Sequence, residues 1–410
     1  MVQNIILKRD EAEEIKKLNG WLIIYGRRKT GKTFLIKNFL DYDAYFLVRR
    51  DGKILAEKTL PKEINNIQDF LKLISDLLNE NKTVIIDEFQ RLPEFVFDEF
   101  SNLHPKGKII FSGSSFKILK KIFSNQSPLL GMVLQYELNL IKPKNILREL
   151  SKHLDSVKTI EFASYFRDPW TLSFFKGEET VKELYNLLNY SKLTIPSLIG
   201  EIFIEEEREL TKIYEAILRI LGSGEWNYKT VADFLSGRKL IERSDSSLVL
   251  PYIKNLQKMS LVEHLDIYNS KKKMYKLKSA IMEAFYYLCD RYNFEDKEVS
   301  FSEALPTLDK IKNFAVQNFV ADFFAEHLNG RKEYSISSDK EVDIIINSRN
   351  KIVAIGEVKW GKYNINDLDN FIEKTKSIDC KKFFVVKNKD REIYKGIIIY
   401  DAKNMIDMSK

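Results

Sequence analysis

The apolar positions in the first third of the chain form short runs that alternate with helical stripes. Continuous runs at residues 21–25, 44–48, 83–86 and 108–111 are rich in β-branched and aromatic residues. Such runs are typical of parallel strands that are buried on both faces. A stripe with helical spacing occupies residues 67–78, as expected for a helix that covers a sheet. The alternation predicts an α/β fold with a parallel sheet.

The middle of the chain changes character. Residues 147–198 are helical and mixed, and helical stripes follow at 210–221, 228–235 and 247–259. Two short strands at 261–265 and 274–277 come next. Three helices followed by a hairpin predict a winged helix-turn-helix.

A third pattern fills the C-terminal part. A helix is expected at 308–328 and another at 366–377, with strands at 333–336, 341–346, 351–359, 382–386 and 396–400. The order helix, three strands, helix, strand resembles the core of the PD-(D/E)XK nuclease group. This resemblance implies an α/β restriction-endonuclease-like domain.

One polar segment stands between the first apolar run and the next helical stripe. Two glycines separated by four residues are followed by lysine and threonine, which is the phosphate-binding loop pattern in its strand–loop–helix setting. A chance basic turn is the alternative. The segment consists of Gly26, Arg27, Arg28, Lys29, Thr30, Gly31, Lys32 and Thr33. We expect it to bind ATP or ADP, with Lys32 on the β- and γ-phosphates and Thr33 as a ligand of Mg²⁺.

The run at 83–86 ends in two carboxylates. Asp87 is expected to hold the Mg²⁺ shell, and Glu88 is expected to act as the catalytic base that polarises the attacking water. The next strand ends with Ser112 and Ser114. These serines either sense the γ-phosphate or belong to an ordinary turn.

Together with the loop, three further segments resemble the archaeal ATPase family, a group of AAA+-related, STAND-like P-loop proteins. They lie at residues 84–94, 111–115 and 127–131. The resemblance implies a helical lid that closes on the nucleotide. In that family an arginine usually follows the glycine at 131 and is thought to face the nucleotide or the sheet. Met132 stands there, so Arg91 or a partner subunit would supply that charge.

Three residues in the C-terminal pattern are candidates for nuclease chemistry. Glu357 and Lys359 are two apart on a strand and share one face. Asp343, on the adjacent hairpin strand, is expected to meet Glu357 and hold a second divalent cation, while Lys359 orients water or stabilises charge. The nuclease group usually has a glutamate on the preceding helix, where this chain has Gln317. An active nuclease and an inactive binding domain therefore both stay open.

The composition limits the classes of protein to which the chain can belong. The 410 residues are 44% hydrophobic and carry 66 basic against 59 acidic residues, which permits nucleic-acid contact without requiring it. Two cysteines, Cys289 and Cys380, indicate neither a disulfide framework nor a zinc site. The sequence has no run long enough to cross a bilayer and no signal-peptide pattern. We therefore expect a cytoplasmic protein that does not bind membranes.

The lysines of the expected winged helix are compatible with two roles of this module. The hairpin carries Lys271, Lys272 and Lys273, and the third helix carries Lys254 and Lys258. Such a module either docks on DNA phosphates or locks the lid and binds protein.

The sequence thus predicts a multidomain α/β protein. The expected parts are a P-loop parallel-sheet ATPase core at 1–140, a helical lid at 141–205, a winged helix at 206–292 and a PD-(D/E)XK nuclease-like domain at 300–410. The favoured function is an ATP-hydrolysing switch that couples nucleotide state to DNA binding or processing. The alternative is a STAND-type regulator whose inactive nuclease-like domain binds a protein partner. Self-assembly into an oligomer stays open.

Overall fold

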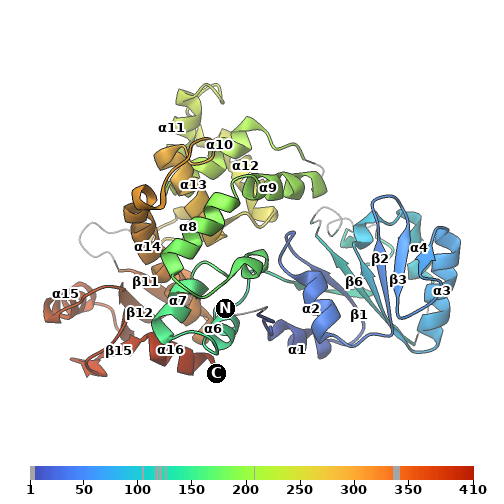
Figure 1. The fold of residues 1–410 in the computed structure, drawn as a ribbon, viewed down its shortest axis with the longest axis horizontal. Coiled ribbons are helices and arrows are strands. Elements are labelled where there is room, and N and C mark those ends of the chain that lie inside the picture. The colour runs from blue at the N-terminus through green and yellow to red at the C-terminus, as the bar shows by residue number, and fades with distance from the viewer. Residues whose placement is uncertain are drawn as a thin grey trace. The chain divides into compact units, whose positions relative to one another are not determined.

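The computed structural model describes residues 5–103, 106–114, 116, 119, 122–124, 127–206, 208–335 and 342–410. The chain divides into two compact units (Figure 1). The N-terminal unit comprises Lys8–Leu140 and Leu198–Glu209, and the C-terminal unit comprises Met1–Leu7, Ile141–Ser197 and Leu210–Lys410.

The N-terminal unit is built on a sheet with the strand order β4-β3-β2-β5-β6-β1-β7. From β2 to β7 in this order the strands run parallel, and β3 and β4 are antiparallel at one edge. The bounds are β1 Trp21–Tyr25, β2 Ala44–Val48, β3 Ile54–Glu57, β4 Glu63–Ile64, β5 Thr83–Asp87, β6 Lys108–Gly113 and β7 Val133–Glu137. The predicted parallel sheet is confirmed, and its central strands end at one edge.

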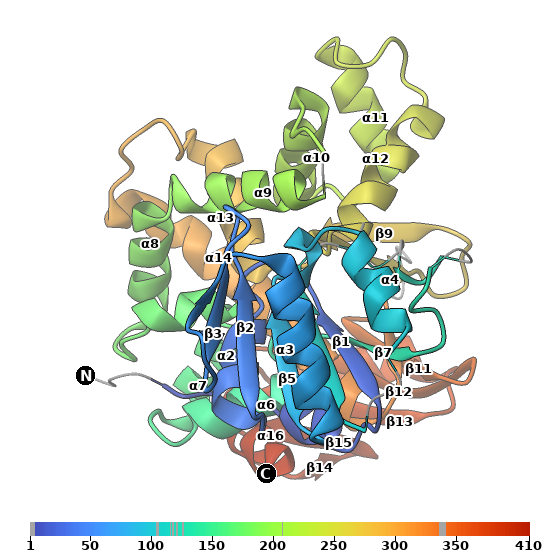
Figure 2. The ribbon, with the colours of Figure 1, turned by 90° about the vertical axis from the view of Figure 1, so that its right-hand side faces the viewer.

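Helices cover both faces of this sheet. Helices α1 (Glu11–Lys16) and α2 (Lys32–Phe39) lie on one face, and α3 (Ile67–Asn79) and α4 (Phe95–Ser101) lie on the other (Figures 1 and 2). Successive strand residues point to opposite faces, so Ile23 joins the core under α3 and α4 while Ile24 joins the core under α2. This sandwich fixes the strand ends that carry the candidate site.

The expected lid is divided between the two units. Residues 141–197 belong to the C-terminal unit, whereas α9 (Thr194–Glu205) belongs to the N-terminal unit from Leu198 onward. The other helical segments of this region are α6 (Pro143–Leu150), α7 (Ser156–Ala163), η2 (Pro169–Phe174) and α8 (Thr180–Tyr190). Helices α6, α7 and α8 pack against α14 (Phe301–His327), and α6 and α7 also pack against α16 (Ala402–Ser409). The Arg167–Asp322 ion pair at 2.5 Å links this region to α14, and the hydrogen bond from Trp360 to Glu161 at 3.0 Å links α7 to the end of β12.

Three helices and a hairpin follow at the expected positions. They are α10 (Lys212–Gly222), α11 (Tyr228–Gly237), α12 (Ser246–Lys258), β8 (Val262–Asp266) and β9 (Lys273–Leu277), followed by α13 (Ala280–Tyr292). Strands β8 and β9 pair antiparallel. Beyond the hairpin, the Tyr268 amide donates to the Tyr334 carbonyl and the Tyr334 amide donates to the Asp266 carbonyl, both at 2.9 Å. The hairpin is therefore tied to the chain that follows β10.

The C-terminal sheet has the order β10-β11-β12-β13-β15-β14. Its strands are β10 Arg331–Glu333, β11 Ile344–Ser348, β12 Lys351–Lys359, β13 Lys381–Val386, β14 Ile393–Tyr394 and β15 Ile397–Asp401. Helix α15 (Ile365–Thr375) packs on one face through Leu368 and Phe371. Phe324 of α14 stacks on Phe383 of the sheet at a centroid distance of 4.1 Å.

The expected order of helices and strands is present in this sheet, with differences at the ends. Strand β11 begins at Ile344, later than expected, and residues 336–341 lie outside the described residues. Helix α14 begins early, at Phe301, because the Ser300 side chain caps its first turn. Assignment of this sheet to the nuclease group stays a prediction.

Within the described residues, the helices are too short or too polar to span a lipid bilayer.

Candidate functional site

The phosphate-loop segment joins β1 to α2 in a conformation that requires its glycines. A Cβ atom on Gly26 would stand 2.1 Å from the Leu138 carbonyl oxygen, so a larger residue would displace the backbone. Gly31 has φ +85° and stands just before the first turn of α2, a conformation that glycine adopts without strain. Arg9 donates to the Thr30 carbonyl oxygen at 2.9 Å. The loop is thus fixed at its start, middle and end.

Lys32 lies inside this loop. Its Nζ donates to the carbonyl oxygens of Gly26 at 2.7 Å and Arg27 at 3.1 Å. The side chain is buried, and burial lowers the pKa of Lys32 to about 8, although Glu88 and Asp87 favour its charged form. The loop therefore encloses a cation next to the amides at the start of α2, the arrangement that favours anions.

Asp87 gathers polar groups at the end of β5. Its Oδ2 accepts hydrogen bonds from Thr33 Oγ1 and from the Tyr45 hydroxyl, each at 2.7 Å. Its Oδ1 accepts from the Glu88 amide at 3.0 Å. Hydroxyl and carboxylate oxygens are ligands that Mg²⁺ prefers. The structure thus brings together Thr33 and Asp87, the two residues expected to hold the metal.

Glu88 begins a tight turn with φ +57° into η1 (Phe89–Arg91). Its Oε2 accepts from Gln90 Nε2 at 3.0 Å and forms an ion pair with Arg91 at 2.8 Å. Burial raises the pKa of Glu88, with a further contribution from Asp87 and an opposing one from Arg91. A carboxylate with a raised pKa is suited to act as a base. Arg91 also donates to the Val48 carbonyl oxygen at 2.8 Å, so Arg91 restrains Glu88.

Two acidic residues of α9 pair with the loop, which sequence reasoning missed. Arg28 Nη1 lies 2.5 Å from Glu205 Oε1, and Arg28 Nε lies 2.5 Å from Glu201 Oε2. Burial lowers the pKa of Arg28, but its hydrogen bond and ion pair with Glu205 outweigh that effect and raise it. The i, i+4 spacing of the two glutamates signals a shared helix face. The spacing alone does not identify Arg28, which is 177 residues from Glu205 in the sequence, as their partner.

Ser112 and Ser114 differ in their surroundings. Ser112 is fully buried, pairs in register with Asp87, and has an Oγ without a hydrogen-bond partner among the described residues. Ser114 Oγ accepts from Gln90 at 3.4 Å. Of the two serines, Ser112 is thus the one that stands beside Asp87.

Met132 lies at the far edge of the sheet from the loop. It directly precedes β7, whose first residue, Val133, pairs with Trp21 at the start of β1. The phosphate loop follows the other end of β1, after Tyr25. Strands of this length span about 16 Å, so a side chain at 132 does not face the loop of its own unit.

The C-terminal sheet brings the three candidate nuclease residues together. Ile344 pairs with Gly356, which sets Asp343 beside Glu357, and Asp343 Oδ2 accepts from the Val358 amide at 2.8 Å. Lys359 Nζ lies 3.3 Å from Glu357 Oε1. Burial lowers the pKa of Lys359, but the two carboxylates raise it on balance.

The second carboxylate oxygen of Glu357, Oε2, is the candidate ligand for a metal ion. Glu357 is buried, and its Oε2 has no hydrogen-bond partner among the described residues. Gln317 lies half-buried on α14, which packs against β11. The described residues contain no group of three or more His, Cys, Asp or Glu side chains placed to hold a metal. The fit to a divalent cation therefore rests on two carboxylates.

The basic hairpin is exposed, but the amides of the third helix are engaged. Asn255 donates to the Tyr214 hydroxyl at 2.9 Å, and Gln257 lies 2.7 Å from His264. Lys271, Lys272 and Lys273 are exposed. Contacts with a phosphate backbone are thus open to this hairpin, whereas reading of bases would require the amides to change partners.

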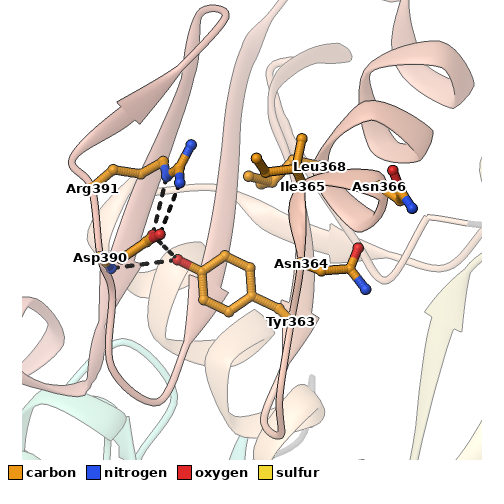
Figure 3. A pocket seen from close by; sticks show the side chains of 7 residues that line it. All are labelled: Tyr363, Asn364, Ile365, Asn366, Leu368, Asp390 and Arg391. Carbon is orange, nitrogen blue, oxygen red and sulfur yellow. Dashed lines mark hydrogen bonds and ion pairs between the residues drawn. The ribbon is translucent and has the colours of Figure 1, made fainter.

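A pocket of about 570 Å³ lies at the start of α15 (Figure 3). Asp390 forms an ion pair with Arg391 at 2.8 Å and accepts from the Tyr363 hydroxyl at its rim. The lining residues are Tyr363, Asn364, Ile365, Asn366, Leu368, Asp390 and Arg391. The residues predicted from the sequence for chemistry are not among them.

Comparison with known families identifies one part of the chain. Residues 18–147 match the family model described as an AAA domain. This part of the chain is similar to the AAA domains of P-loop ATPases. The match includes the loop, Asp87 and Glu88, and it agrees with the parallel sheet. Among curated proteins, none matches the sequence significantly.

Solved structures show only distant likenesses. The Aeropyrum pernix ORC2 protein in its ADP form is 15% identical, with a TM-score of 0.31 and coverage of 77% of this chain and 96% of that protein. The Aeropyrum pernix ORC1 protein in complex with DNA is 11% identical, with a TM-score of 0.31 and coverage of 71% and 94%. A Pyrococcus horikoshii STAND protein with a tetratricopeptide repeat sensor is 19% identical, with a TM-score of 0.26 and coverage of 78% and 48%. These scores are too low to establish a shared fold over the aligned lengths.

Proposed function

We propose that the N-terminal unit binds ATP with Mg²⁺ and hydrolyses it as a molecular switch. The proposal rests on the Thr33–Asp87 hydrogen bond beside the loop that encloses Lys32. The hydroxyl of Ser112 on the neighbouring strand, which has no hydrogen-bond partner among the residues that the structure describes, adds a polar group at the same edge. The match of this region to an AAA domain supports the same function.

Each residue takes a separate role in this proposal. The loop amides and Lys32 bind the phosphates of ATP, and Thr33 and Asp87 hold the metal. When bound, Mg²⁺ neutralises charge on the phosphate oxygens. Glu88 accepts a proton from water as the water oxygen bonds to the γ-phosphorus and the bond to the ADP oxygen breaks. Glu88 first has to loosen its contacts with Arg91 and Gln90.

Phosphate release by the full chain tests this function. The wild type is expected to release phosphate from Mg²⁺-ATP. Glu88→Gln is expected to bind ATP but to release phosphate at least about 100-fold more slowly, because general-base catalysis contributes at least that factor. Glu99→Gln, a matched charge change at an exposed position of α4, serves as the control. Equal rates for Glu88→Gln and wild type would refute the assignment of the base.

For the C-terminal unit we propose a nuclease-like site that acts on DNA. The specific observation is the buried Oε2 of Glu357, which has no hydrogen-bond partner in the described part of the chain, beside Asp343 and Lys359. Asp343 and Glu357 would hold a divalent cation, which when bound polarises a phosphate oxygen. Lys359 would stabilise the charge that develops there. The alternative is a domain that does not cleave and binds a protein partner.

Cleavage of plasmid and single-stranded DNA with Mn²⁺ separates these two roles. The proposal predicts cleavage by the wild type that is lost in Asp343→Asn and in Glu357→Gln. Glu373→Gln, at an exposed position of α15, is the control and should cleave normally. No cleavage by the wild type, or cleavage that survives both substitutions, would favour the protein-binding alternative.

The hairpin has its own test. We propose that Lys271, Lys272 and Lys273 contact DNA phosphates. Replacing all three by alanine should weaken duplex binding. The slope of the logarithm of the binding constant against the logarithm of the salt concentration should also become shallower, by the contribution of about three phosphate contacts. A wild type with salt-insensitive or undetectable duplex binding would exclude this role.

A further inference from the structure

The side chain of Arg28 has unexpected partners for a residue of a phosphate-binding segment. It belongs to the phosphate-loop segment, yet its guanidinium is paired with two carboxylates of α9. The side chain of Arg28 is 23% exposed and that of Glu205 is 12% exposed. Arg28 Nε is buried and close to Glu201, but it lacks an aligned hydrogen-bond partner among the described residues. The contact of Nε with Glu201 is thus an ion pair without an aligned hydrogen bond.

The same side chain acts on the charges of the candidate site. Its positive charge disfavours the charged form of Lys32, whereas Glu88 favours the charged form of Arg28. Glu205 in turn disfavours the charged form of Glu88. Arg28, Lys32, Glu88 and Glu205 therefore form one electrostatic group around the space where the proposed function places the phosphates.

The neighbouring cations are engaged in other ways. Lys32 lies among the loop carbonyls, Arg91 restrains Glu88, and Arg9 binds the Thr30 carbonyl and Glu11. Met132 stands at the far edge of the sheet. Arg28 is paired with side chains that can be exchanged for another anion without breaking backbone hydrogen bonds.

We propose that Arg28 is a nucleotide sensor that exchanges Glu201 and Glu205 for the γ-phosphate of ATP. This inference rests on the proposed function of the same site. The γ-phosphate carries more charge than either carboxylate and can engage the guanidinium through two oxygens, whereas each glutamate contacts it through one. Binding of ATP therefore releases the acidic face of α9, and ADP, which lacks the γ-phosphate, leaves it paired.

The segment that receives this signal connects the two units along the chain. Helix α9 begins in the C-terminal unit and continues into the N-terminal unit at Leu198. Ile202 and Phe203 are buried, and Glu206 accepts a hydrogen bond from the Phe116 amide. These contacts keep the helix end in place, so the exchange loosens its last turn and does not unfold it.

Nucleotide affinities of isosteric variants test the exchange. Glu205→Gln should bind ATP about fivefold to tenfold more tightly than wild type, because ATP no longer competes with a partly buried ion pair. Its affinity for ADP should change less than twofold. Glu209→Gln removes the same charge at an exposed position of the same segment and should change neither affinity.

A double-mutant cycle separates the ion pair from the general field of the carboxylate. In an Arg28→Ala background, Glu205→Gln should no longer improve the ratio of ATP to ADP affinity. Hydrogen–deuterium exchange provides a second readout: the amides of residues 203–206 should exchange faster when ATP is added to wild type. In Arg28→Ala they should exchange fast with or without ATP.

The outcomes distinguish this inference from the function on which it rests. If wild type binds no nucleotide, the proposed function and the sensor both fail. If wild type binds ATP but Glu205→Gln leaves the ATP-to-ADP ratio unchanged, only the sensor fails. Protection of residues 203–206 by ATP would also overturn it, because α9 would then close on the nucleotide.

Discussion

The unusual titration of Lys32 predicts how ATP binding depends on pH. The perturbation is a change of pH from 7 to 9.5 at constant Mg²⁺. Burial lowers the pKa of Lys32 to about 8, with Glu88, Asp87 and Glu205 acting in the opposite direction. The triphosphate favours the protonated ammonium. Above pH 8, binding of ATP therefore requires uptake of a proton by Lys32, and its affinity should fall as the pH rises.

The size of the effect follows from this pKa. At pH 7 about nine-tenths of the free protein carries a charged Lys32, and at pH 9 about one-tenth does. The dissociation constant for ATP should therefore rise about tenfold between pH 7 and pH 9. Phosphate groups titrate near pH 6, so ATP itself changes little over this range.

Calorimetry in two buffers with different ionisation enthalpies measures both the affinity and the proton uptake. At pH 9 about 0.9 proton should be taken up per ATP bound. Lys72→Ala, which removes an exposed lysine of α3 outside the loop, should keep the pH dependence. A dissociation constant that stays level from pH 7 to 9.5, without proton uptake, would refute the titration of Lys32 as its cause.

Three further substitutions test the two sites. Gly26→Ala should abolish ATP binding, because its Cβ would stand 2.1 Å from the Leu138 carbonyl oxygen; titration with ATP checks this, and unchanged affinity contradicts it. Thr33→Ala should weaken binding of Mg²⁺-ATP more than binding of metal-free ATP, and an equal loss in titrations with and without EDTA would exclude a metal-ligand role. Gly356→Ala should destabilise the C-terminal unit by about 1–3 kcal/mol through overpacking, because its Cβ would stand 2.2 Å from the Phe383 ring; an unchanged melting temperature contradicts this.

The N-terminal site could be predicted because its signals are local. The apolar runs define strands, and the spacing from Gly26 to Thr33 defines a loop between a strand and a helix. Parallel strands end at one edge, so Asp87 was expected near Thr33, and their hydrogen bond agrees with that expectation. The contacts of Tyr45 with Asp87 and of Arg28 with α9 had no local signal, because they join residues 42 and 177 positions apart.

In the C-terminal unit, the hydrophobic pattern predicted some strands and helices and missed others. Strand β12 was predicted with its observed bounds because residues 352–355 form a continuous apolar run within a segment of strand length. Strand β14 was missed because two residues carry no periodicity. Helix α16 was missed although Asp401 and Asn404 form a capping box, a usable signal at the start of a helix. The packing of 141–197 on α14 and α16 depends on tertiary contacts that the helical stripes do not specify.

Binding of Mg²⁺-ATP to the full chain tests the central claim most directly. Calorimetry with wild type, Lys32→Ala and the control Lys72→Ala, which removes an exposed lysine of α3 in the same unit, measures it. We predict one site per chain in wild type and in Lys72→Ala, and no measurable binding in Lys32→Ala, because the loop then lacks its buried cation. No binding by wild type, or equal binding by Lys32→Ala, would contradict the assignment of residues 26–33 as the nucleotide site.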